Sequence, residues 1–143
     1  MPNRHTFPNP FPEKHCAVLA FAYAAGMDES HAVNLANQMK ARRGPTGRPY
    51  LTACGAAYNM QATTVFQEWC MASGLRVVSE LWRPHCTVAT FARRYPEGRW
   101  IVCSRTHAVA CLDGVLHGFW LDGARVVFAR RVEQVDAGAA SVV

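Results

Sequence analysis

The chain has 143 residues, of which 50% are hydrophobic and 17% are charged, and it carries a net charge of +5. A chain of this length and composition folds as a globular domain and can bury its core without disulfide staples. Its longest apolar stretch, residues 17–25, is too short to cross a bilayer, which excludes a membrane-spanning protein. We therefore expect a single domain over residues 1–143, located in the cytoplasm.

Helices are expected in the first part of the chain. Residues 1–12 are rich in proline and contain no apolar run, so they should form an irregular arm and not a secretory signal. The alanine-rich run over residues 16–25 predicts a helix that is buried on nearly all sides and that Gly26 ends. Residues 28–40 predict a second helix, with acidic residues at its start and basic residues at its end.

The middle of the chain contains signals for both helix and strand. Residues 43–51 are rich in glycine and proline and should form a loop. A third helix is expected over residues 52–73, where apolar residues form a short stripe. A short strand should follow over residues 76–81, and then a small helix over residues 88–95 with Thr87 as its N-cap.

The last part of the chain changes to the pattern of a β-sheet. Four runs read as strands, over residues 99–104, 107–112, 115–120 and 125–132. The Asp113–Gly114 pair is a strong signal for a two-residue hairpin turn. This order predicts an α+β fold, in which N-terminal helices pack on a C-terminal antiparallel β-meander. Residues 136–143 should form a frayed tail.

Basic residues are densest over residues 40–49, which include Arg42, Arg43 and Arg48. A basic loop of this kind can bind the phosphates of a nucleic acid or an acidic protein. Few aromatic residues are interleaved with it, although nucleic-acid binding favours them. A solvated surface loop is therefore the simpler interpretation.

The chain contains six cysteines, and the absence of a secretory signal favours free thiols over disulfides. No spacing typical of a metal site occurs, because His15–Cys16 and His85–Cys86 are adjacent pairs whose side chains diverge. We therefore expect no metal and no other cofactor, and a zinc module is the least favoured interpretation.

Cys16 and His107 are the strongest candidates for a catalytic pair. Cys16 lies in the first turn of the first expected helix, where backbone amides and the helix dipole lower the pKa of a thiol. His107 begins a strand expected to pack against that helix, where an imidazole can act as general base. Cys86, beside His85, is the main competitor. Taken alone, Cys16 and His107 would each more simply be packed core residues.

Three segments, in this order, resemble small papain-like cysteine peptidase domains of phage and bacterial genomes: HCAVLAFAYAAG (15–26), TVATFARRYPEGRWIV (87–102) and THAVACLDGVLHGFW (106–120). Those domains carry a DCxxRALA helix, a TVxxFxxxxPxGxYIV segment and a GHxxAVVDGxxxDTW segment. The resemblance covers most of the chain and is weakest through residues 40–75. It implies a papain-like fold, with Cys16 as nucleophile and His107 as general base.

The chain departs from this family pattern at position 118. The family has an Asp or Asn there that orients the histidine, and this chain has Gly118. If Asp113–Gly114 form the hairpin loop, Trp120 lies opposite His107, and Asp122 lies diagonal to it on the same face. Asp122 is therefore the candidate for orienting His107, and Trp120 for shielding it from water. Otherwise, Asp122 only forms a turn.

An oxyanion hole would combine the Cys16 backbone amide with a side-chain donor upstream. Papain-like enzymes use Gln there, and because none precedes Cys16, Asn9 is the candidate, with His15 as second choice. The resemblance thus implies a cysteine peptidase, or a related thiol acyl-transfer hydrolase, acting on a peptide or protein. The alternative is a catalytically degenerate, phage-encoded papain-like binding protein whose basic surface contacts a host protein or a nucleic acid.

Overall fold

A computed structural model describes residues 16–26, 28–40, 42–44, 47, 60–61, 63–118 and 123–135. In this part of the chain, helices and strands form the expected α+β fold. The helices are α1 (Cys16–Ala25), α2 (Glu29–Met39), α4 (Thr63–Ser73) and α5 (Val88–Arg94), and the strands are β1 (Leu75–Trp82), β2 (Arg99–Cys103), β3 (Ala108–Leu112), β4 (Val115–His117) and β5 (Phe128–Gln134). The arm over residues 1–12 and the tail over residues 136–143 lie outside the described residues. No described helix has the length and apolar character needed to cross a membrane.

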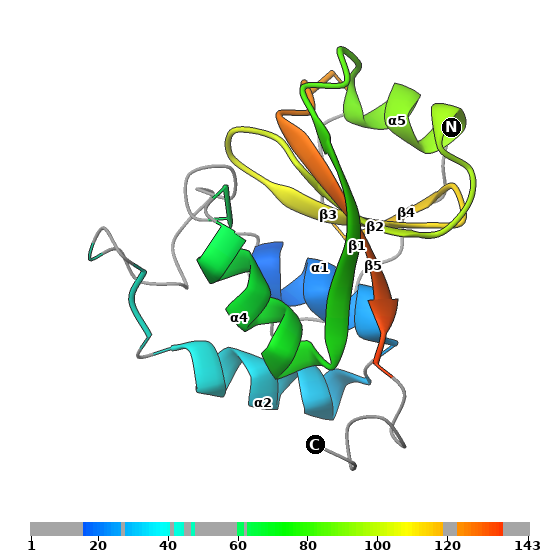
Figure 1. The fold of residues 1–143 in the computed structure, drawn as a ribbon. Coiled ribbons are helices and arrows are strands. Elements are labelled where there is room, and N and C mark those ends of the chain that lie inside the picture. The colour runs from blue at the N-terminus through cyan, green and yellow to red at the C-terminus, as the bar shows by residue number, and fades with distance from the viewer. Residues whose placement is uncertain are drawn as a thin grey trace.

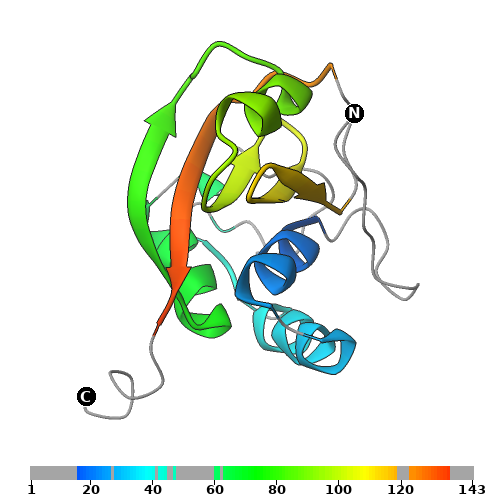
Figure 2. The same ribbon diagram turned by 90° about the vertical axis from the view of Figure 1, so that its right-hand side faces the viewer.

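The strands belong to one antiparallel sheet in the order β1-β5-β2-β3-β4 (Figure 1). Strands β2, β3 and β4 form the expected meander, but β5 crosses back and lies between β1 and β2 (Figure 2). The prediction that the last strand continues the meander is therefore wrong. At the edge of the meander, β4 has only 3 residues, so it could form few backbone hydrogen bonds with a further strand. Between β1 and β2, β5 is paired on both edges and buries Phe128, Ala129 and Val132.

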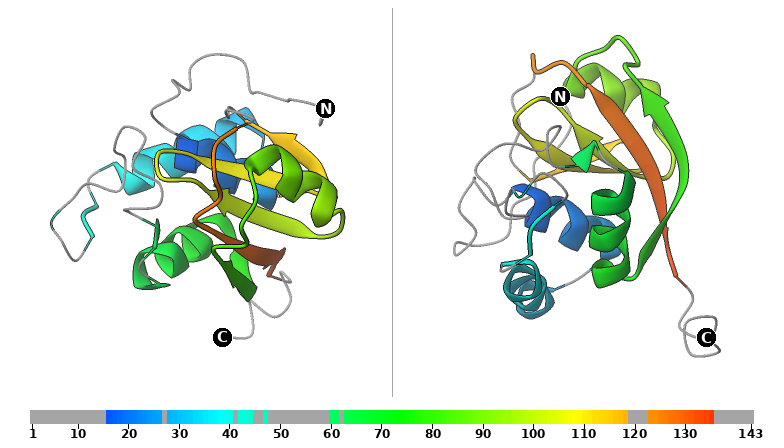
Figure 3. Two further views of the ribbon diagram at one scale, coloured as in Figure 1. Left: turned by 90° about the horizontal axis from the view of Figure 1, so that it is seen from above. Right: turned by 60° about the vertical axis from the view of Figure 1, so that its left-hand side comes forward.

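Helices cover both faces of the sheet (Figures 1 and 3). α1, α2 and α4 lie on one face, where their apolar side chains form one cluster with Ile101 and Cys103 of β2. α5 lies on the other face, where Phe91 belongs to a second cluster with Trp100 and Val102 of the same strand. Alternate residues of β2 thus point to opposite faces, so this strand is buried on both sides.

Helix α1 lies at the centre of the larger cluster, and its bounds agree with the expectation from the sequence. The ring of Phe21 is fully buried, with its centroid 5.3 Å from that of Trp69 and 5.2 Å from that of Phe66. Gly26 follows the helix with a φ of 69°, a left-handed conformation that glycine adopts without steric cost.

Side-chain caps determine where α2 and α5 begin. The Asp28 carboxylate accepts a hydrogen bond from the His31 N–H at 2.9 Å, and the Thr87 hydroxyl accepts one from the Thr90 N–H at 3.2 Å. Each cap satisfies an amide that the first helical turn does not use. The expected N-cap at Thr87 is confirmed, and both helices end one residue earlier than expected.

The third expected helix, over residues 52–73, is not continuous: Met60 is helical, but the chain bends at Gln61 before α4. Residues 51–59 lie outside the described part of the chain. The Arg130 guanidinium donates to the carbonyl oxygens of Met60 at 2.6 Å and of Gln61 at 2.9 Å. A continuous helix would use both carbonyls in its own hydrogen bonds, so this tertiary contact takes the place of a helical turn.

The hairpin between β3 and β4 forms at the expected turn. Leu112 pairs with Val115, and both turn residues have positive φ, 49° for Asp113 and 80° for Gly114. This combination is typical of a type I′ turn. The Asp113 carboxylate accepts a hydrogen bond from the Gly98 N–H at 2.9 Å, which ties the hairpin to the start of β2.

The strand after this turn is shorter than expected. The sequence predicts a strand over residues 115–120, but β4 ends at His117, and Gly118 bends the chain with a φ of 106°. An extended strand does not continue through this conformation. The observed pairing therefore does not extend to the predicted pair of Trp120 and His107, and Trp120 lies outside the described residues.

Candidate active site

Several segments meet at one end of the sheet. Phe128, the first residue of β5, pairs with Trp82 at the end of β1 and with Cys103 at the end of β2. Cys103 also pairs with Ala108, the first residue of β3. α1 begins at the same end, because the Ala108 N–H donates a hydrogen bond to Cys16 Sγ at 3.4 Å. Residues that are far apart in the sequence therefore gather at this end of the sheet.

Cys16 is the first residue of α1, and only 5% of its surface is exposed. The backbone N–H groups of a first helical turn are not used by the helix itself, and they favour a negative charge at its N-terminus. The Ala108 N–H adds a hydrogen bond to the sulfur from outside the helix, and such a donor stabilises a thiolate more than a thiol. Burial acts in the opposite direction, because it keeps water away from the charge.

His107 directly precedes Ala108, so covalent geometry places its Cα within about 6 Å of Cys16 Sγ. His107 is half-buried and lies in the turn between β2 and β3. In this turn the Ser104 N–H donates to the His107 carbonyl at 2.9 Å, and the His107 N–H donates to Ser104 Oγ at 3.1 Å. The structure thus brings the backbone of His107 close to the Cys16 sulfur, and it adds Ser104, which sequence reasoning missed, as the residue that holds this backbone.

The position of His107 before β3 corrects the expectation that it begins this strand. Ala108 belongs to the cluster on the α1 face of the sheet, and Val109 belongs to the cluster on the α5 face. Strict alternation would direct His107 to the α5 face. Because β3 begins only at Ala108, the turn sets the direction of the imidazole. His117 of β4 lies on the α1 face, where its ring centroid is 5.0 Å from that of Tyr23.

The other described cysteines are poor candidates for the nucleophile. Cys70, Cys86, Cys103 and Cys111 are buried free thiols. Burial raises the pKa of Cys70 to about 12 and that of Cys111 to about 11, and it also raises the pKa of Cys86 and of Cys103. A thiol with a raised pKa keeps its proton at neutral pH and is a weak nucleophile, which disfavours the competitor Cys86. Cys54 lies outside the described residues.

Asp122, Trp120 and Asn9 lie outside the described part of the chain, so their roles stay predictions. Gly118 stands where the similar domains carry their acid. A Cβ added to Gly118 would meet nothing within 4 Å, but its φ of 106° strains any L-residue. This backbone does not suit the Asp or Asn that the resemblance leads one to expect at position 118.

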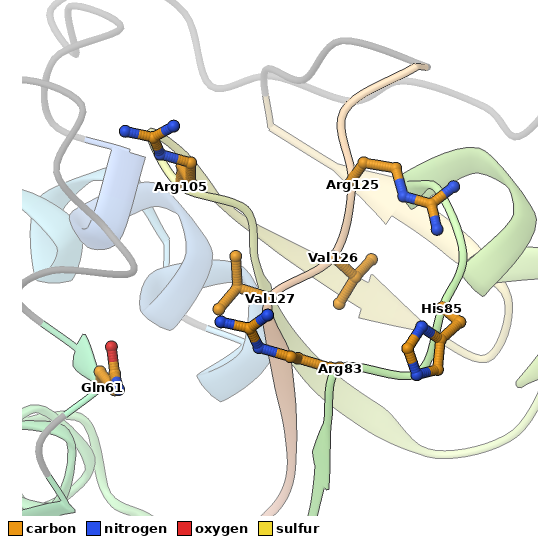
Figure 4. A pocket seen from close by; sticks show the side chains of 7 residues that line it. All are labelled: Gln61, Arg83, His85, Arg105, Arg125, Val126 and Val127. Atoms are coloured by element: carbon orange, nitrogen blue, oxygen red, sulfur yellow. The ribbon is translucent and has the colours of Figure 1, made fainter.

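A pocket of about 480 Å³ opens at the same end of the sheet (Figure 4). The residues that line it are mostly basic or polar: Gln61, Arg83, His85, Arg105, Arg125, Val126 and Val127. Sequence reasoning missed this pocket, because its arginines are isolated from one another along the chain. The available signal was that each of them lies close to one end of a strand: Arg83 directly after β1, Arg105 two residues after β2 and Arg125 three residues before β5.

The basic loop that sequence reasoning singled out is partly engaged within the protein. Arg42 forms an ion pair with Glu68 of α4 at 3.0 Å, and the Arg43 guanidinium donates to the Gly47 carbonyl at 2.9 Å. Arg48 lies outside the described residues. These exposed contacts are weak, but the ion pair offsets the charge of Arg42, and the bond to Gly47 occupies one donor of Arg43.

Within the described residues, no group of three or more His, Cys, Asp or Glu side chains is placed to hold a metal ion. The chain matches no protein-family model, no curated protein and no solved structure.

Proposed function

We propose that the protein is a thiol acyl-transfer hydrolase, a cysteine peptidase of papain-like type, in which Cys16 is the nucleophile and His107 the general base. The observation that carries this proposal is the hydrogen bond of 3.4 Å from the Ala108 N–H to Cys16 Sγ. It joins the start of the central helix to the residue after the histidine, 92 positions along the chain. A thiol at a helix start beside an imidazole is the arrangement that activates the nucleophile in Cys-His enzymes.

In the proposed reaction, His107 takes the proton of the Cys16 thiol, and the thiolate attacks the carbonyl carbon of a peptide or isopeptide bond. The C–N bond of the tetrahedral adduct then breaks, and the imidazolium gives its proton to the leaving amine. Water, deprotonated by His107, attacks the thioester, which releases the carboxylic acid and restores the Cys16 thiol. These steps require no cofactor.

The oxyanion of the tetrahedral adduct requires hydrogen-bond donors. The Cys16 backbone N–H belongs to the first turn of α1, whose amides point out of the helix, and this supports its role as one donor. Asn9 is the proposed second donor. Asp122 is the proposed acid that orients His107, and Trp120 the proposed shield of its ring.

Labelling with iodoacetamide at about pH 6.5 tests the nucleophile, because only a thiol with a low pKa reacts quickly there. The folded protein should take up one adduct at Cys16 before Cys86, whose pKa is raised by burial, reacts. Cys16→Ala should abolish this adduct, and Cys86→Ala, the matched control, should keep it. His107→Ala should slow the labelling. Labelling of Cys16→Ala at an undiminished rate would refute the assignment.

Gly118 favours a second function, because its φ of 106° does not suit the acid of the similar domains. In this alternative the chain is a catalytically degenerate, phage-encoded papain-like domain that binds a host protein or a nucleic acid through its basic surface. A library of quenched fluorescent peptides separates the two functions: a hydrolase cleaves some of them, and Cys16→Ala abolishes the cleavage. Binding of a nucleic acid would instead weaken steeply with salt and survive Cys16→Ala.

A further inference from the structure

The pocket at the end of the sheet collects basic side chains from separate connections. Arg83 and His85 come from the segment between β1 and α5, Arg105 from the turn between β2 and β3, and Arg125 from the segment before β5. Figure 4 shows Arg125 and His85 on one side of the pocket, Arg105 on the other, and Arg83 extending toward Val127. The described lining contains no Asp or Glu. A concave surface with charges of one sign concentrates ligands of the opposite charge.

The arginines of this pocket have no acceptors within the described part of the protein. The guanidinium groups of Arg83, Arg105 and Arg125 make no hydrogen bond and no ion pair with a described residue, and all three side chains are exposed. Other arginines are engaged by acceptors of the chain: Arg42 by Glu68, Arg76 by Glu133, Arg94 by the Pro84 carbonyl, Arg99 by the Ala24 carbonyl and Arg130 by Glu80. The pocket arginines are therefore available to bind anionic groups of a ligand.

The backbone on one side of the pocket is held in an unfavourable conformation. Arg83 and His85 have positive φ values of 47° and 58°, which residues other than glycine rarely adopt. The Arg83 N–H donates to the Val127 carbonyl at 2.8 Å, and the Val126 N–H donates to the Cys86 carbonyl at 3.0 Å. These bonds hold the strained segment against the chain before β5. Such strain concentrates at binding sites, where the surrounding structure fixes the side chains in advance.

The pocket borders the candidate active site. Arg105 lies two residues before His107, so their Cα atoms are at most about 8 Å apart. Val127, which lines the pocket, packs against the core cluster that contains Cys16. An extended peptide advances by about 3.3 Å per residue. A substrate side chain that lies a few residues away from the bond attacked by Cys16 is therefore within reach of the pocket arginines.

We propose that this pocket is a substrate subsite that binds an acidic segment of a polypeptide, through its Asp and Glu carboxylates, beside the bond that Cys16 attacks. The inference rests on the proposed function for the position of that bond. The guanidinium groups are spread along the pocket (Figure 4), which suits several carboxylates of an extended chain better than a single phosphate. No Phe, Tyr or Trp belongs to the described lining itself, and the exposed Trp82 beside it already stacks on Phe128 and contacts Arg83, which disfavours the base stacking that single-stranded nucleic acids use.

Binding is measured with the full-length Cys16→Ala variant, which holds a substrate without cleaving it. Fluorescence anisotropy compares two labelled octapeptides that differ only in having Glu or Gln at the central positions. The Glu peptide should bind about tenfold more tightly, because hydrogen bonds between guanidinium and carboxylate are stronger than neutral ones. Arg105→Gln and Arg125→Gln should each reduce this preference several-fold. Arg76→Gln, which removes an exposed arginine near the other end of β1, should leave the preference unchanged.

The outcomes separate the subsite from the hydrolase. Equal binding of the two peptides would overturn the subsite, even if the wild-type protein cleaves both of them. Arginine-dependent binding of the Glu peptide without cleavage by the wild type would support the acidic ligand and count against the hydrolase. Tighter binding of a single-stranded oligonucleotide, with the same loss in Arg105→Gln, would overturn the choice of a polypeptide. Thermal melting followed by circular dichroism verifies that each variant is folded.

Discussion

Arg130 of β5 is a buried cation, with 3% of its surface exposed, and its replacement by Met tests what holds the centre of the sheet to the segment before α4. Its guanidinium donates to the Met60 carbonyl at 2.6 Å, to the Gln61 carbonyl at 2.9 Å and to the Glu80 carboxylate at 2.6 Å. It also lies 4.6 Å from the ring centroids of Phe66 and Phe128. Methionine is flexible enough to fill the space left by the arginine, but it brings neither charge nor donors.

These contacts differ in what they contribute to stability. Met60 is buried, so its carbonyl would lose its donor without gaining water, which costs about 1–3 kcal/mol. Glu80 is 44% exposed, and a pair in which water can replace the lost partner contributes less than about 1 kcal/mol. The contact between the cation and the rings adds about 1–2 kcal/mol, which is partly offset because the variant no longer buries a charge. Arg130→Met should therefore lower the free energy of unfolding by about 3 kcal/mol.

Urea unfolding at neutral pH, followed by tryptophan fluorescence and by circular dichroism, measures this loss. Glu80→Gln is the matched variant, because it removes the ion pair and leaves the carbonyl and ring contacts of Arg130 in place. It should cost less than about 1 kcal/mol. Arg131→Gln, at the exposed neighbour on the same strand, should change stability by less than about 0.5 kcal/mol. If Glu80→Gln destabilised the protein as much as Arg130→Met, the ion pair would dominate, and the ranking of contacts would be wrong.

Two further predictions concern stability. Gly98→Ala should lower the free energy of unfolding by about 1–2 kcal/mol, because Gly98 has a φ of 90° that an L-residue strains to adopt. Gly123→Ala, at a glycine without a positive φ in this range, should lower the free energy of unfolding by less than about 0.5 kcal/mol. If urea titrations showed equal losses of stability for the two variants, the positive φ of Gly98 would not be the cause. The stability should also fall as the pH rises above 9, because the thiols of Cys70 and Cys111 ionise near 9 when unfolded and keep their protons to about 12 and about 11 when folded. Above pH 9, each thiol lowers the free energy of unfolding by up to about 1.4 kcal/mol per pH unit. A double variant with Cys70→Ala and Cys111→Ala should therefore lose stability less steeply between about pH 8 and about pH 10. An equally steep loss in this variant would refute the assignment of the pH dependence to these two thiols.

The elements that the sequence predicts well depend on neighbouring residues. The Thr87 hydroxyl binds an amide three positions ahead, and Gly26 ends α1 by its own backbone conformation. The turn at Asp113 and Gly114 is likewise encoded by two adjacent residues. Such signals are complete within a short window, so they can be recognised without knowledge of the fold.

The elements that the sequence predicts poorly depend on distant residues. The bend at Gln61 before α4 is tied to Arg130, 69 positions along the chain. The position of β5 between β1 and β2 depends on two sets of pairing partners, and nothing in the composition of residues 128–134 identifies either set. The pattern of apolar residues reveals that a segment is a strand, but not which strands it will pair with.

For the candidate site, the sequence alone determined the local setting of Cys16 at a helix start and the presence of His107 close to a strand. Only the tertiary structure decided that the amide after His107 bonds to the sulfur of Cys16, and that Arg83, Arg105 and Arg125 line one pocket. The physical reason is that strand order brings the connections at one end of a sheet together. Strand order results from the packing of the whole chain, so no short segment of the sequence carries it.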